Sequence, residues 1–138
     1  TIDGEKLSAG YHGLSHHGND PDKIAEFNQV GKKQVANFGR FLSVLNQKKD
    51  AQGRPLLDTT AVFYGSGMGN ANTHNNSRLP ALLAGGGYRH GAHHAIDREN
   101  ETKATPLLGD LFLSIMESMG VGQERFVKAS RNMNDYLL

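Results

Sequence analysis

Histidine is the residue type in this sequence best suited to chemistry, and its copies are grouped. His12, His16 and His17 lie within six residues, beside Ser15, in the stretch YHGLSHHGND (Tyr11 to Asp20). Neutral imidazoles bind metal ions, and histidines also lie beside bound phosphate or sulfate. This spacing makes the stretch a candidate metal or anion site. The alternative is a solvated loop whose polar side chains only cap a helix.

The elements around these histidines can be predicted from their neighbours. Gly13 and Gly18 favour a tight loop over a regular helix. A helix should follow, because Asp20 is a good N-cap, Pro21 suits the first helical position and Asp22 places negative charge in the first turn. The positive end of the helix dipole disfavours imidazolium and attracts anions. We therefore expect neutral histidines near a helix N-terminus.

A second candidate loop, GSGMGNANTHNN, follows an apolar run from Thr59 to Tyr64 that predicts a strand buried on both faces. Open α/β sheets bind ligands in loops at the carboxyl ends of strands, which makes His74 a candidate ligand. A further group, His90, His93 and His94, lies in GGGYRHGAHHAID. For this group we favour surface or loop packing, and we keep them as secondary candidates for ligation.

The remaining periodicity predicts an α/β layer arrangement, in which helices pack against the strands. Apolar residues at helical spacing predict a long helix from Pro21 to about Lys48. LPALLA, from Leu79 to Ala84, predicts a second short strand. Thr105 is the expected cap of another helix that begins at Pro106 and ends before Gly120.

Composition limits the classes of function. The chain has 138 residues, enough for a single domain or for the C-terminal fragment of a larger one, and its net charge of +1 with no long basic run argues against nucleic acid as a partner. No cysteine is present, so a metal would have nitrogen and oxygen ligands. No stretch is apolar enough to predict a transmembrane segment. Because the chain opens at Thr1 without methionine, we expect it to be a piece of a longer protein.

Four stretches together resemble the C-terminal part of the HXXSHH family, bacterial proteins of unknown function. They are YHGLSHHGNDPDK, YGSGMGNANTHNN with LPALLAGGG, GYRHGAHHAIDREN, and TPLLGDLFLSIMESMGV. His12, Ser15, His16 and His17 match the motif that names the family. Full members are several times longer and often begin with an export signal. The resemblance therefore implies a missing N-terminal region and an exported, periplasmic or cell-envelope location.

That family is in turn distantly similar to the alkaline phosphatase and sulfatase-like hydrolases. The similarity implies an α/β fold with helices packed on a mostly parallel sheet, as in the C-terminal portion of an alkaline-phosphatase-like fold. It also matches His17 and His74 to two metal-ligand histidines. Two positions depart from the pattern: Ser15 stands where an acid is expected, and GSGMG after Tyr64 replaces an Asp-His pair. With fewer carboxylates, zinc or another divalent metal on histidines is the cofactor that we expect.

The residues and the resemblance leave two functions open. One is a metal-dependent hydrolase of phosphate or sulfate esters; the other is a non-catalytic exported binding or assembly subunit that retains the scaffold. A serine hydrolase that uses Ser15 with His12 or His16 is a weaker third, because no G-x-S-x-G motif surrounds the serine. Two strands make a small sheet, so we expect a missing N-terminal region or a partner chain to complete it. We also expect His17 and His74, with His12 or His16 near by, to lie within a few ångströms of one another.

Overall fold

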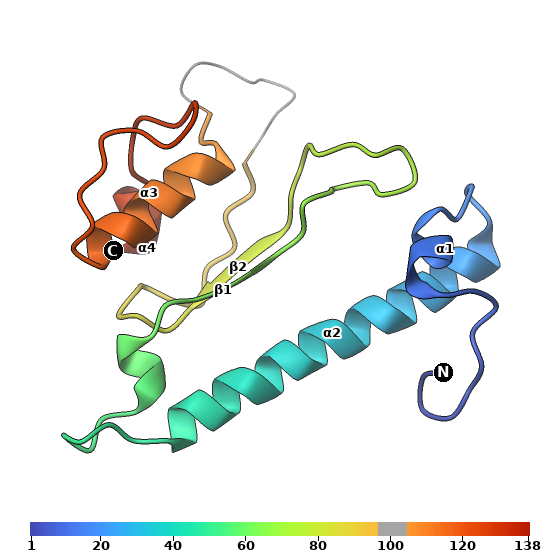
Figure 1. Cartoon of the computed structure of the whole chain (residues 1–138), viewed down its shortest axis with the longest axis horizontal. Helices are drawn as coiled ribbons and strands as arrows, with labels where there is room; N and C mark the ends of the chain where they lie inside the picture. The colour runs from blue at the N-terminus through green and yellow to red at the C-terminus, as the bar shows by residue number, and fades with distance from the viewer. Residues whose placement is uncertain (97–104) are drawn as a thin grey trace. The chain divides into compact units, whose positions relative to one another are not determined.

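The computed structural model describes residues 1–96 and 105–138, and the chain divides into two compact units. The N-terminal unit comprises residues 1–58 and 64–82, and the C-terminal unit comprises residues 59–63 and 83–138. Figure 1 shows the elements of each unit.

The long helix α2, Pro21–Gln47, is the main element of the N-terminal unit (Figure 1). The predicted cap is confirmed: Asp20 Oδ1 accepts hydrogen bonds from the backbone N–H of Asp22 at 2.9 Å and of Lys23 at 3.3 Å. These bonds satisfy two of the donors that a helix start leaves free. No residue of α2 is fully buried. Among the described residues, no helix has both the length and the apolar character needed to cross a membrane.

The predicted loop before α2 is wrong in part, because Tyr11–Ser15 form a short helix, α1. Gly13 is helical here although it lowers helix propensity, because Leu14 is completely buried and anchors the turn. The Tyr11 ring lies 5.5 Å from that of Phe27 on α2, measured between centroids. Tertiary packing of α1 on α2 therefore outweighs the local cost of the glycine.

The expected mostly parallel α/β sheet is wrong. The described residues form a single two-stranded antiparallel sheet, in which β1, Val62–Gly65, pairs with β2, Ala81–Ala84. Residues 66–80 return the chain directly without a crossover helix, and only a crossover would have allowed parallel pairing. The side chains of β1 alternate between half-buried and exposed, so the predicted burial on both faces is also wrong. A 3-10 turn, Leu56–Thr59, occupies the start of the predicted first strand.

In the C-terminal unit, helix α3 spans Leu108–Ser118, two residues later than the start predicted at Pro106. Asp110 moves the start, because its Oδ2 accepts the backbone N–H of Leu107 at 2.7 Å. The predicted end is confirmed: Gly120 has φ +76°, and the N–H of Val121 returns to the carbonyl of Met116. This is the Schellman arrangement, which favours glycine.

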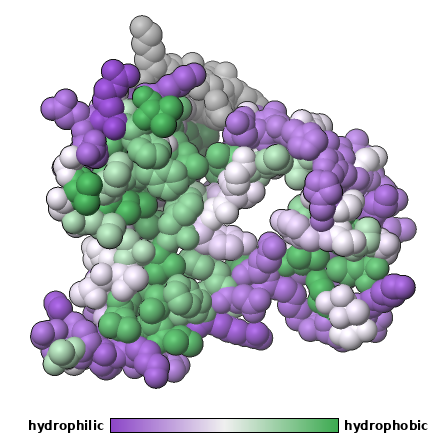
Figure 2. Space-filling model, in the orientation of Figure 1, coloured by the Kyte–Doolittle hydropathy of each residue, from purple (hydrophilic) through white to green (hydrophobic). Residues whose placement is uncertain are grey.

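The core of the C-terminal unit is small. Its buried apolar residues are Leu111 and Leu113 of α3 together with Tyr88 and Ala129. The chain ends in a single turn, α4, Asn134–Leu137. Figure 2 shows hydrophobic residues gathered on the visible surface of the unit that contains α3. Much apolar surface thus stays outside this core.

Candidate functional site

Two loops of the N-terminal unit meet at one hydrogen bond. The backbone N–H of Gly18 donates to Oδ1 of Asn72 at 2.9 Å. This bond joins the segment that carries the first three histidines to the loop that carries His74. The predicted convergence of these two stretches therefore has a defined structural basis.

His12 and His16 lie one above the other across the turn of α1. The backbone N–H of His16 donates to the carbonyl of His12 at 3.3 Å, and the two ring centroids lie 4.7 Å apart, nearly edge to face. Positions four residues apart on a helix share one face, which is the spacing that places paired histidines on one metal in helical zinc motifs. The unexpected helix α1 thus brings two imidazoles together.

His74 completes the group. Its ring centroid lies 4.9 Å from that of His16, again nearly edge to face. His74 has φ +52°, a left-handed conformation that turns the chain at the tip of its loop. We call His12, His16 and His74 the histidine cluster. The ring contact with His74 is made by His16, one of the two histidines expected beside the His17–His74 pair, and not by His17.

His17 and Ser15 have other contacts. Nδ1 of His17 accepts the backbone N–H of Asn19 at 3.0 Å, so this ring nitrogen supports the turn that leads into α2. Ser15 is nearly buried, and its hydroxyl donates to the carbonyl of His12 at 2.8 Å. The Ser15 hydroxyl therefore closes the α1 turn and is not poised as a nucleophile.

The loop that presents His74 is held by its own backbone. The N–H groups of Gly69 and Asn70 donate to the carbonyl of Asn75 at 2.9 and 3.1 Å, and the N–H of Asn75 returns to the carbonyl of Asn70 at 2.9 Å. A Cβ at Gly69 would lie only 1.8 Å from the carbonyl oxygen of Ser77. The close approach of two backbone segments therefore requires glycine at this position.

The secondary candidates lie in the C-terminal unit. His90 and His93 are exposed, and the ring of His94 lies 5.1 Å from that of Tyr136, edge to face. The backbone beside them is tied to the chain end, because the N–H of Arg89 donates to the carbonyl of Leu137 at 2.7 Å. His94 thus has the packing contact that the sequence favoured for this group.

The imidazoles of the histidine cluster have the ligand chemistry that a divalent metal takes. Imidazole nitrogens bind zinc at about 2.0–2.1 Å, which sets the ring centroids of two ligands on one tetrahedral ion at about 5 Å. The rings nevertheless meet edge to face. Within residues 1–96 and 105–138, no three His, Asp or Glu side chains are already arranged around one metal position. A metal would therefore require the side chains of His12 and His74, which are exposed, to move.

Comparison of the chain with protein-family models, with curated proteins and with solved structures finds no match. The site therefore has to be judged on its own geometry. Asn72, which joins the two loops, was missed by the sequence reasoning, although it lies two residues from His74 in a loop that had been singled out. Its residue type is common in such loops, so only the long-range contact distinguishes it.

Proposed function

We propose that this chain is a metal-binding protein whose histidine cluster holds zinc or another divalent metal. The observation that carries the proposal is the contact of His16 with both His12 and His74, at centroid separations of 4.7 and 4.9 Å. Three imidazoles from two distant segments form a nitrogen-only ligand set, which zinc accepts and hard oxygen-seeking cations do not favour.

The surroundings support a role in binding more than one in catalysis. The hydroxyl of Ser15 already donates to a main-chain carbonyl, and the mostly parallel sheet that the hydrolase similarity implied is absent from the described residues. We therefore favour a non-catalytic binding or assembly subunit. The HXXSHH resemblance adds an exported location to this proposal.

The small sheet supports a partner as part of the same proposal. Each strand of the β1–β2 pair has one neighbour among the described residues, which leaves one edge of each strand open. A two-stranded sheet is marginal by itself, and open edges accept further strands. A missing N-terminal region or a partner chain would complete the sheet.

Zinc titration by calorimetry tests the proposal. The unaltered chain should bind one zinc ion near neutral pH, and His16→Ala and His74→Ala should each weaken binding by at least about tenfold, because each removes one of three ligands. His93→Ala is the matched control, since His93 is exposed and belongs to the C-terminal unit. Equal affinities for His16→Ala and the unaltered chain would contradict the proposed site.

An activity assay separates the two functional candidates. The zinc-loaded chain should not hydrolyse p-nitrophenyl phosphate or p-nitrophenyl sulfate faster than free zinc does. If the chain does turn over either substrate, and if His16→Ala abolishes this activity while His93→Ala retains it, the protein is a hydrolase and not a binding subunit.

A further inference from the structure

On one face of α2, two glycines meet no other segment of the chain. Gly31, Val35 and Gly39 follow one another at intervals of four residues and therefore lie along a single face. Val35 is 49% exposed, and a Cβ added at either glycine would meet no atom of another segment within 4 Å. Each glycine inside a helix costs about 1 kcal/mol relative to alanine. No described segment of the chain uses the close approach that these glycines allow.

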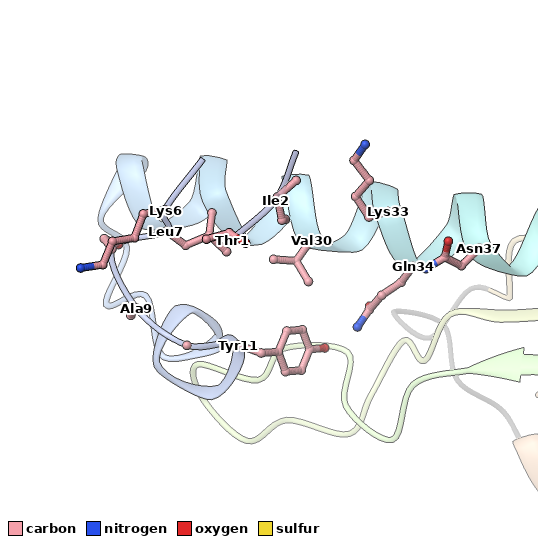
Figure 3. Close-up of a pocket in the computed structure, with 12 residues that line it drawn as sticks. Thr1, Ile2, Lys6, Leu7, Ala9, Tyr11, Val30, Lys33, Gln34 and Asn37 are labelled. Atoms are coloured by element: carbon pink, nitrogen blue, oxygen red, sulfur yellow. The ribbon is translucent and has the colours of Figure 1, made fainter. Parts of the chain in front are cut away.

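A different flank of α2 is already occupied. Nζ of Lys33 lies 2.6 Å from Oδ2 of Asp3, and the hydroxyl of Ser8 donates to Oε2 of Glu26 at 2.7 Å. Figure 3 shows Val30 on this flank, in a pocket that the N-terminal residues also line. The N-terminal segment therefore covers one side of α2, and the Gly31–Gly39 face stays open.

The open face continues into an apolar groove of about 800 Å³. Gly31, Val35 and Phe41 line its α2 wall, and residues 64–66 with Pro80 and Leu82 line the opposite wall. Phe41 and Leu82 are 51% and 44% exposed. None of the residues that line the groove is charged. Apolar surface of this kind, without charge at its centre, is typical of a protein interface.

The charges at the two ends of α2 indicate the occupant. Asp20 and Asp22 stand at its start, and Lys48 and Lys49 follow its end. The next residue, Asp50, is acidic but is paired with Arg54 at 2.9 Å, so the charge left at this end is basic. In an antiparallel pair of α2 helices, the acidic N-terminus of each helix lies beside the basic C-terminal end of the other. In a parallel pair, termini of like charge would lie together and repel.

We propose that a second copy of this chain packs its α2 antiparallel against this face, about a two-fold axis near Val35. The axis sets Val35 against Val35 of the second copy and Gly31 against Gly39 of the second copy. The same surface then serves both chains, as a two-fold interface requires, and the glycines let the backbones approach. This interface does not depend on metal binding by the histidine cluster.

Cysteine cross-linking in the full chain tests this arrangement directly, because the sequence contains no cysteine. Val35→Cys should form a disulfide-linked dimer under mild oxidation, since the axis places the two thiols together. Asn28→Cys is the matched control: antiparallel packing sets its two copies about 21 Å apart along the helix. Cross-linking of Asn28→Cys to the same extent as Val35→Cys would overturn the antiparallel two-fold.

Sedimentation of the unaltered chain gives a second readout that needs no variant. A dimer is expected at about 100 µM, where a complex of micromolar dissociation constant is fully formed. Val35→Glu should give a monomer with unchanged helix content, because it buries two like charges at the axis. A monomeric unaltered chain at that concentration would overturn the proposal, and so would a dimer that Val35→Glu leaves intact.

Discussion

Gly18 and Asn72 are fifty-four residues apart in sequence, yet the backbone N–H of the first donates to the side-chain oxygen of the second at 2.9 Å. The same fold sets the rings of His16 and His74 at a centroid separation of 4.9 Å. The hydrogen bond and the ring contact together hold two loops that the chain alone would leave independent. Asn72 is therefore a positioning residue for the histidine cluster.

Asn72→Ala should weaken zinc binding several-fold, because it removes the bond to Gly18 and loosens His74 relative to His16. The lost hydrogen bond costs about 0.5–1.5 kcal/mol. Calorimetric titration measures the affinity, with Asn76→Ala, an exposed neighbour in the same loop, as control. Equal weakening in both variants would assign the effect to general loop disturbance.

Gly69→Ala should distort the loop that carries His74, because its Cβ would lie 1.8 Å from the Ser77 carbonyl oxygen. Overpacking of this kind costs about 1–3 kcal/mol. Gly67→Ala is a close control, because a Cβ there meets no atom within 4 Å. Amide hydrogen exchange should speed up over residues 66–80 in Gly69→Ala and stay unchanged in Gly67→Ala. Unchanged exchange in both variants would contradict the close approach of the Gly69 and Ser77 backbones.

Asp110→Asn should destabilise the C-terminal unit. Asp110 is 1% exposed, its Oδ1 accepts the backbone N–H groups of Ser130 and Arg131 at 3.3 Å each, and Nε of Arg131 lies 3.5 Å from its Oδ2. The amide side chain of the variant would lack the negative charge, and its NH₂ group could face the N–H groups that the carboxylate now accepts. We therefore expect the free energy of unfolding to fall by about 2–4 kcal/mol. Urea unfolding followed by circular dichroism measures it. Glu124→Gln, at an exposed position, should leave the midpoint unchanged.

The turn from Asp50 to Arg54 should loosen in acid. Hydrogen bonds from the backbone N–H of Arg54, and then from its side chain and from the N–H of Gln52, hold the pKa of Asp50 below the ordinary 3.8. Because the pKa is lower in the folded state, the ionised carboxylate stabilises the turn at any pH above the pKa of the unfolded state. This stabilisation is lost as the pH falls through the pKa of the folded state. Carboxyl chemical shifts in an NMR titration should give a midpoint below 3.8. A midpoint at or above that value would contradict the assigned bonds.

The elements whose signals are local could be predicted from the sequence. Asp20 and Pro21 predicted the start of α2, and Gly120 predicted the end of α3. A helix cap or a left-handed glycine depends only on residues a few positions away in the sequence. The histidines of both loops were also identified as candidates from residue type and spacing alone. The start of α3 was displaced by two residues, since Asp110 caps Leu107 and also holds Ser130 and Arg131, which lie far along the chain.

How distant segments of the chain combine depends on tertiary packing. The pattern of two short apolar runs was compatible with either sheet direction, and the direct return of residues 66–80 made the pair antiparallel. Gly13 argued against a helix, yet burial of Leu14 stabilises α1 and so sets His12 over His16. His16, and not His17, contacts the ring of His74 because of the backbone conformation of α1. Local propensity does not specify that conformation, because the packing energy that selects it comes from residues distant in sequence.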